Sequence, residues 1–153
     1  MPLAHARVSD DVGWVAMAHP ARHNALSEAL IADLAATFDD FRDQRVRAVV
    51  LRSAPGSKVW SAGHDISELP QSQRDPLGWS DPLRVLVRTI ESFPAPVLGM
   101  IDGTVWGGAC EVALACDFAV ATPDATFAVT PAKLGIPYNI SGLMTFLNVV
   151  PLP

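Results

Sequence analysis

The 153-residue sequence has only two cysteines, Cys110 and Cys116, and a single tyrosine, Tyr138. Two cysteines are too few for a disulfide framework or a four-cysteine zinc site. We expect both to be small buried hydrophobic residues of a cytoplasmic protein in a reducing compartment. No apolar stretch approaches the roughly 18 residues of a membrane span, and the first residues lack the apolar segment of a secretory signal.

Positive charge is also scarce, because 11 Lys and Arg face 16 Asp and Glu, giving a net charge of −5. This balance disfavours nucleic acid and anionic membranes as partners, since neither attracts a net-negative surface. The chain is 50% hydrophobic, which excludes a disordered protein. Its length is that of one domain, so we expect residues 1–153 to form a single core.

The common catalytic motifs are missing as well. The sequence contains no G-x-S-x-G, no G-x-G-x-x-G, no Gly-Lys-Ser/Thr phosphate loop and no H-E-x-x-H. Ser61, His64 and Asp65 lie too close together on one loop to form a triad without special geometry. His19 and His23 are four residues apart, but the intervening Pro20 breaks a helical face, so we expect exposed loop histidines and no metal site.

What the sequence does contain is an alternation of strand-like and helix-like patterns, which predicts an α/β fold. We expect strands over residues 12–18, 46–51, 96–101, 117–121 and 126–129. We expect helices that begin after the caps Ser27 and Asp81, at Gly107-Gly108, and over residues 141–149. Between them, residues 53–81 form a long polar connection, with a helical turn over 65–69, whose length favours a functional role.

Two glycine-bearing segments, residues 61–66 and 105–111, each follow a loop and open a helical turn or helix. Such positions present backbone N–H groups without intrahelical partners and remove side-chain bulk beside them. Two donors aimed at one point could hold a developing oxyanion. Glycines at helix starts can equally serve close packing, and the residues alone leave both interpretations open.

The two segments together, Ser-Ala-Gly-His-Asp-Ile at 61–66 and Gly-Thr-Val-Trp-Gly-Gly-Ala-Cys-Glu at 103–111, resemble the crotonase (enoyl-CoA hydratase/isomerase) superfamily. Residues 24–27 and 117–121 match that family in the same order. The resemblance implies a crotonase/ClpP-like spiral of ββα units around an acyl-CoA thioester site. It also implies that the N–H groups of His64 and Gly108 polarise the thioester carbonyl.

Further segments resemble the biotin-independent methylmalonyl-CoA decarboxylases of this family: 68–70, 75–77, 81–84, 105–109, 130–131 and 134–139. Glu111 matches the first hydratase glutamate, but no carboxylate stands near residues 130–132, where the second would be. The resemblance implies decarboxylation of methylmalonyl-CoA to propionyl-CoA through a thioester enolate, with no cofactor. Tyr138 would then bind the substrate carboxylate, His64 and Thr130 would shape the acyl pocket, and Glu111 would give structural or proton-positioning support.

The resemblance also indicates where CoA would bind. The implied contacts are Ala62, Gly63, His64, Asp65, Ile66, Gly107 and Gly108, with positive charge from Lys58 and Arg22 beside His23.

Two other interpretations stay open: enoyl-CoA hydration or isomerisation by Glu111 alone, and a non-catalytic CoA-binding fragment. Family members are longer and end in a helical region that helps to build trimers. Because this chain ends at Pro151-Leu152-Pro153 directly after an apolar helix, we expect a core truncated before that region. A full-length form would be a homo-oligomer, either a trimer or a dimer of trimers.

Overall fold

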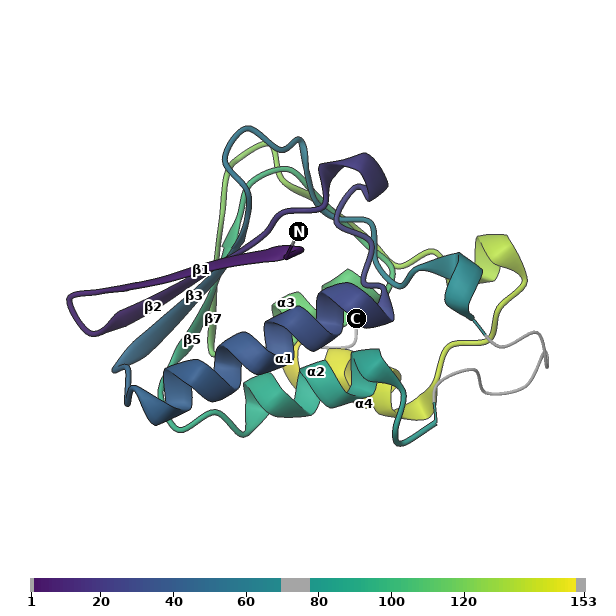
Figure 1. The fold of residues 1–153 in the computed structure, drawn as a ribbon. Coiled ribbons are helices and arrows are strands. Elements are labelled where there is room, and N and C mark those ends of the chain that lie inside the picture. Colours follow the sequence, from purple (N-terminus) through teal and green to yellow (C-terminus); the bar gives the residue numbers. More distant parts are fainter. Residues whose placement is uncertain (1, 70–77, 151–153) are drawn as a thin grey trace.

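The computed structural model describes residues 2–69 and 78–150, which form two β-sheets and the helices packed against them (Figure 1). The larger sheet has the strand order β1-β2-β3-β5-β7 and the smaller one β4-β6-β8. The strands are β1 Ala4–Ser9, β2 Val12–Met17, β3 Ala48–Ser53, β4 Val59–Ser61, β5 Val97–Ile101, β6 Thr104–Trp106, β7 Phe118–Ala121 and β8 Thr126–Ala128. The helices are α1 Glu28–Asp43, α2 Pro82–Glu91, α3 Gly108–Ala115 and α4 Ile140–Val149, with short 3₁₀ turns at Pro20–Arg22, Ile66–Glu68 and Pro131–Leu134.

The chain repeats one path three times. β3, β5 and β7 each lie in the larger sheet and lead into β4, β6 and β8 of the smaller one. A helix follows β4 and β6, and the Pro131–Leu134 turn with α4 follows β8. All neighbouring strands pair in parallel except the β1–β2 hairpin. This spiral of ββα units confirms the predicted α/β crotonase fold.

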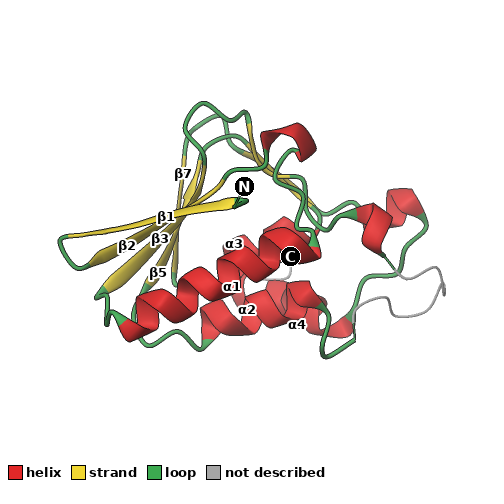
Figure 2. Ribbon diagram, in the orientation of Figure 1, coloured by secondary structure: helices red, strands yellow, loops and turns green. Residues whose placement is uncertain are grey.

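Helices α1 and α2 lie side by side along one face of the larger sheet (Figure 2). Each begins where the sequence predicts. The Ser27 hydroxyl accepts a hydrogen bond from the Leu30 N–H, and the Asp81 carboxylate accepts one from the Leu83 N–H. The apolar side of α1 is buried as the helical spacing predicts, with Leu30, Ile31, Leu34, Phe38 and Phe41 in the core.

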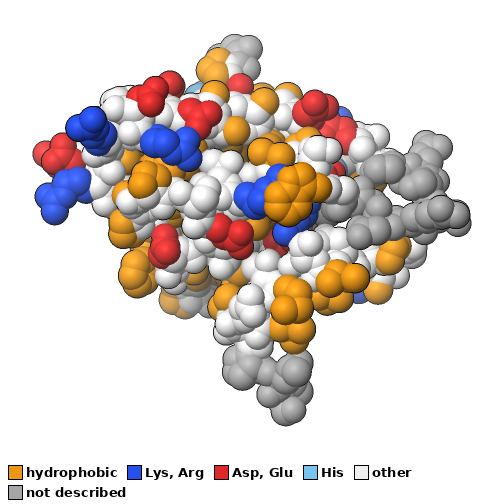
Figure 3. Space-filling view, turned by 90° about the horizontal axis from the view of Figure 1, so that it is seen from below, with side chains coloured by type: hydrophobic (Ala, Val, Ile, Leu, Met, Phe, Trp, Pro, Cys, Tyr) orange, Lys and Arg blue, Asp and Glu red, His pale blue; other side chains and the backbone are white. Residues whose placement is uncertain are grey.

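Helix α4 is largely exposed. Its apolar residues Ile140, Leu143 and Leu147 are all exposed, and its only buried residue is Gly142. Seen from below, hydrophobic side chains lie at the surface among charged ones (Figure 3). Among the described residues, no helix is both long and apolar enough to cross a membrane.

The structure corrects four details of the expected elements. Strands β1 and β6 were not predicted, and β4 lies inside a segment expected to be a polar connection. The predicted strand over 46–51 is shifted, because the Val46 N–H bonds the Phe41 carbonyl just after α1 and β3 begins only at Ala48. Pro70, the match at 75–77 and the ending at 151–153 lie outside the described residues.

Candidate active site

The loop after β4 is fixed by strand-like bonds to the segment before α1. The Leu26 N–H donates to the Gly63 carbonyl (2.8 Å), and the Asp65 N–H donates to the Leu26 carbonyl (3.4 Å). In this pairing the backbone groups of His64 face the opposite side. Among residues 2–69 and 78–150, no protein group accepts a hydrogen bond from the His64 N–H.

Gly108 supplies a second free N–H group. It is the first residue of α3, where the amide has no intrahelical acceptor. The preceding Gly107 adopts φ +54°, and its own N–H donates to the Ala128 carbonyl (2.8 Å). No acceptor for the Gly108 N–H lies within the described part of the chain.

Glycine allows these two amides to approach each other. Gly63 has φ +87°, and a Cβ there would overlap the Trp106 carbonyl oxygen and lie 3.0 Å from the Gly108 nitrogen. A Cβ on Gly108 would be 3.6 Å from the His64 nitrogen. The loop after β4 and the start of α3 are therefore in direct backbone contact, and the structure brings both predicted N–H donors together.

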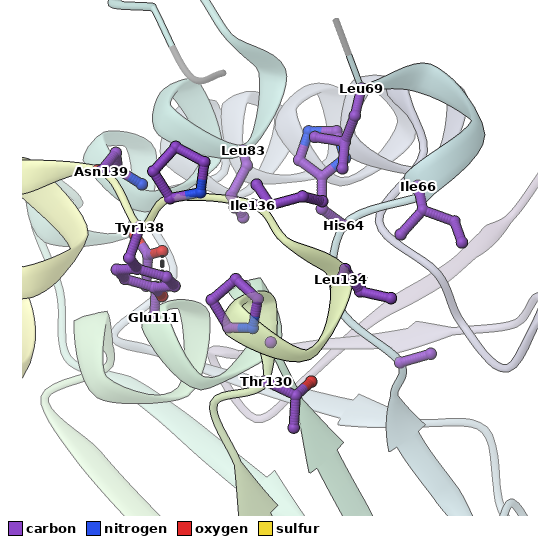
Figure 4. Close-up of a pocket in the computed structure, with 15 residues that line it drawn as sticks. His64, Ile66, Leu69, Leu83, Glu111, Thr130, Leu134, Ile136, Tyr138 and Asn139 are labelled. Carbon is purple, nitrogen blue, oxygen red and sulfur yellow. Dashed lines mark hydrogen bonds between the residues drawn. The ribbon is translucent and has the colours of Figure 1, made fainter. Parts of the chain in front are cut away.

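Both donors border a pocket that is open to solvent on one side. It is lined by Ala62, His64, Ile66, Leu69, Leu83, Gly107, Gly108, Glu111, Thr130, Pro131, Leu134, Ile136, Pro137, Tyr138 and Asn139. Figure 4 shows Glu111 and Tyr138 together at one end of the pocket, with His64 and Ile66 toward the other. The lining is largely apolar, so a ligand here would be desolvated.

Glu111 is the buried charge of this pocket, with 0% of its surface exposed. Its Oε2 accepts a hydrogen bond from Arg84 Nη1 at 2.9 Å, and its Oε1 accepts one from the Tyr138 hydroxyl. Burial raises the pKa of Glu111, against the lowering effects of Tyr138 and then Arg84. Burial, followed by the contact with Glu111, also raises the pKa of Tyr138.

The His64 side chain is fixed by its neighbours. Its Nδ1 lies 3.1 Å from the Asp65 carbonyl oxygen and its Nε2 lies 3.5 Å from Asp81 Oδ2. Asp81 Oδ1 caps α2 at the Leu83 N–H (2.9 Å). The cap of α2 thereby also orients the imidazole that borders the pocket.

Most of the predicted CoA contacts line the pocket, but some do not. The pocket is lined by Ala62, His64, Ile66, Gly107 and Gly108, whereas Gly63 is buried against the backbone of Trp106 and Gly108. The Asp65 carboxylate turns to Ser67, whose bonds are the main cause of its lowered pKa, and lies 3.7 Å from exposed Arg22. Lys58 is exposed and outside the pocket, with its carbonyl bound by the Thr104 N–H.

The structure also bears on the serine triad, the two cysteines and the histidine pair considered in the sequence. Ser61 is fully buried and its hydroxyl donates to the Asn24 carbonyl (2.7 Å), so it forms no triad with His64. Both cysteines are buried and free, as predicted. His23 is exposed as expected, but His19 is only partly so.

Three further residues at the site, Arg84, Asn139 and Gly142, have no role predicted from the sequence. The Asn139 side chain caps α4 by accepting from the Gly142 N–H (2.7 Å). A Cβ on Gly142 would lie 2.6 Å from Glu111 Oε1, so this glycine lets α4 cover the carboxylate. The Asn-x-x-Gly spacing at a helix start is the one signal that could have pointed to this contact.

Comparison with known proteins agrees with this geometry. Residues 7–152 match the model of the family described as enoyl-CoA hydratase/isomerase. The chain belongs to this family. Methylmalonyl-CoA decarboxylase of Escherichia coli (strain K12) is 48% identical over 120 residues, which are 78% of this chain and 46% of that protein. Human mitochondrial methylglutaconyl-CoA hydratase is 34% identical over 116 residues, which are 74% of this chain and 34% of that protein.

Solved structures give the same result. A methylmalonyl-CoA decarboxylase complexed with 2S-carboxypropyl-CoA superposes with a TM-score of 0.91 at 40% identity, covering 95% of this chain and 56% of that one. A methylmalonyl-CoA decarboxylase in complex with 2-nitronate-propionyl-CoA has a TM-score of 0.90, also at 40% identity, covering 94% and 55%. The chain thus spans about half the length of the family members it matches.

Proposed function

We propose that this member of the family decarboxylates a malonyl-type acyl-CoA, converting methylmalonyl-CoA to propionyl-CoA. The observation that carries the proposal is the meeting of two free backbone N–H groups, from His64 and Gly108, at the edge of a largely apolar pocket. Loss of CO₂ from such a substrate leaves an enolate whose charge rests on the thioester oxygen. Two fixed amide donors stabilise that charge without reorganisation, and one such donor typically contributes ~10²–10³ in rate.

Tyr138 supports the choice of a carboxylate-bearing substrate. Tyr138 lines the pocket, and its hydroxyl donates to Glu111. His64 lies toward the opposite end of the pocket (Figure 4). The Tyr138 hydroxyl would bind the substrate carboxylate and hold the breaking C–C bond perpendicular to the thioester plane, where overlap with the forming enolate is best. Thr130 and the His64 side chain would complete the acyl pocket.

The state of Glu111 favours decarboxylation over hydration. Addition of water across an enoyl double bond needs acid and base groups that are free to exchange protons with the water. Among the described residues that line the pocket, Glu111 is the one carboxylate, and both of its oxygens are engaged, by Arg84 and by Tyr138. Decarboxylation needs no base to start it.

For the CoA portion, we extend the proposal to the backbone at Ala62 and Ile66 and to Arg22 as a source of positive charge near the pocket. Lys58 would contact only a part of the ligand that extends beyond the cavity.

Parallel incubations with methylmalonyl-CoA and crotonyl-CoA, followed by mass spectrometry, test the choice of reaction. We expect propionyl-CoA above the no-protein control and no hydroxybutyryl-CoA. Hydration of crotonyl-CoA without decarboxylation would replace this proposal with a hydratase. Binding of both thioesters without turnover would indicate a CoA-binding protein.

A further inference from the structure

Tyr138 has one hydroxyl hydrogen, and Glu111 already accepts it. The proposed substrate brings a second carboxylate to the same hydroxyl. One hydrogen cannot serve two carboxylates, because a tyrosine hydroxyl donates once. If the substrate carboxylate takes that hydrogen, the Glu111 oxygen is left against the phenolic oxygen with no proton between them.

We propose that Glu111 takes up one proton when the substrate binds, and that this proton passes through the Tyr138 hydroxyl to the α-carbon after CO₂ leaves. This inference rests on the proposed function. With Glu111 neutral, its O–H donates to the phenolic oxygen and the Tyr138 O–H donates to the substrate carboxylate, so every contact is satisfied.

The reaction's own balance requires such a proton. When the bond between the α-carbon and the carboxylate breaks, its electron pair forms the enolate, held at the His64 and Gly108 amides. The α-carbon then takes the proton of the Tyr138 hydroxyl, which is replaced by the proton of Glu111. One CO₂ is released and one proton is consumed, and Glu111 returns to its ion pair with Arg84.

The surroundings of Glu111 suit a group that gains and returns a proton. Its carboxylate is fully buried, a condition that favours the neutral form, and Gly142 brings α4 against Oε1. Arg84 on α2 opposes this by favouring the charged form at Oε2 in the free protein. The other titratable groups nearby are Cys110 on α3, and His64 with its partner Asp81 at the other side of the pocket.

The number of protons taken up when a ligand binds tests the proposed protonation of Glu111 directly. Calorimetric titration with 2S-carboxypropyl-CoA, which keeps the carboxylate but has no thioester, would be run at mildly alkaline pH in two buffers of different ionisation enthalpy. We expect about one proton taken up per ligand bound, because the two carboxylates at the Tyr138 hydroxyl need one further hydrogen between them. Propionyl-CoA, which lacks the carboxylate, should bind with no uptake.

Substitutions identify the group that takes up the proton. Glu111→Gln should bind the carboxypropyl ligand without uptake, because its amide donates to the phenolic oxygen without titrating. Tyr138→Phe should also show none, which keeps the test available if burial of an unpaired Arg84 prevents Glu111→Gln from folding. Glu91→Gln, at the exposed end of α2, is the matched control and should behave as the wild type.

The outcomes separate the inference from the function. Binding of the carboxypropyl ligand without uptake overturns the role of Glu111 and leaves the decarboxylation standing. Uptake that persists in Glu111→Gln assigns the proton to another group, such as His64, and overturns it equally. Failure of the wild type to bind the carboxypropyl ligand overturns the proposed function and the inference together.

Discussion

A side chain on Gly108 would begin 3.6 Å from the backbone nitrogen of His64, although the two residues are 44 positions apart in the sequence. This approach depends on Gly63, whose φ of +87° and contact with the Trp106 carbonyl leave no room for a Cβ. The two amides that would hold the thioester oxygen are therefore positioned by the absence of side chains.

Gly63→Ala should separate these amides. The new Cβ collides with backbone, and the left-handed conformation costs about 1–2 kcal/mol more. We expect kcat for decarboxylation to fall on the order of 10²–10³-fold. Gly108→Ala is the comparison, because its Cβ is too close only to the end of the Leu83 side chain (2.6 Å), which can move, while the 3.6 Å to the His64 nitrogen is an ordinary contact. Equal losses in the two variants would contradict this account of the backbone contact.

Tyr138→Phe should reduce turnover while leaving CoA-ester binding nearly unchanged. A hydrogen bond to a charged group contributes about 1.5–3 kcal/mol, so we expect kcat to fall roughly 10- to 100-fold. The measurement is steady-state decarboxylation together with the Kd of propionyl-CoA. Unchanged turnover would remove Tyr138 from the mechanism.

Arg84 and Glu111 form a buried pair, with 11% and 1% of their side chains exposed. Arg84→Met leaves a buried carboxylate uncompensated, and we expect the free energy of unfolding to fall by about 3–5 kcal/mol. The double variant Arg84→Met/Glu111→Gln removes both charges and should recover most of that loss. Chemical denaturation of the single and double variants measures the coupling, and strictly additive losses would show that the pair is not coupled.

The same carboxylate predicts a pH dependence of stability. Because burial raises the pKa of Glu111 above its ordinary 4.5, the folded protein binds this proton more tightly than the unfolded chain. The resulting stabilisation is complete below pH 4.5 and is lost as the pH rises through the raised pKa. The free energy of unfolding is measured by denaturation for the wild type and for Glu111→Gln across this pH window. The wild-type value minus the variant value should fall as the pH rises. If this difference rises with pH, the lowering effect of Arg84 on the pKa of Glu111 exceeds the raising effect of burial.

The sequence, with its family resemblance, names the two backbone donors and also Glu111 and Tyr138, but it predicts neither Arg84 nor the contact that joins these three side chains. The glycines at 63, 107 and 108 mark candidate positions for free amides, because this pattern lies in residues that are adjacent in the sequence. The Arg84–Glu111–Tyr138 chain instead arises where α2, α3 and the segment before α4 pack together, and no local spacing reports that contact. Strands β4 and β6 have only three residues each, too few for a hydrophobic pattern to appear.

The measurement that tests the central claim most directly is the infrared carbonyl frequency of propionyl-CoA, labelled with ¹³C at the thioester carbon and bound to the protein. If His64 and Gly108 donate to that oxygen, the band should shift to lower frequency than in water, and Gly63→Ala should reverse the shift. A bound thioester with the frequency of the free ligand would contradict the account.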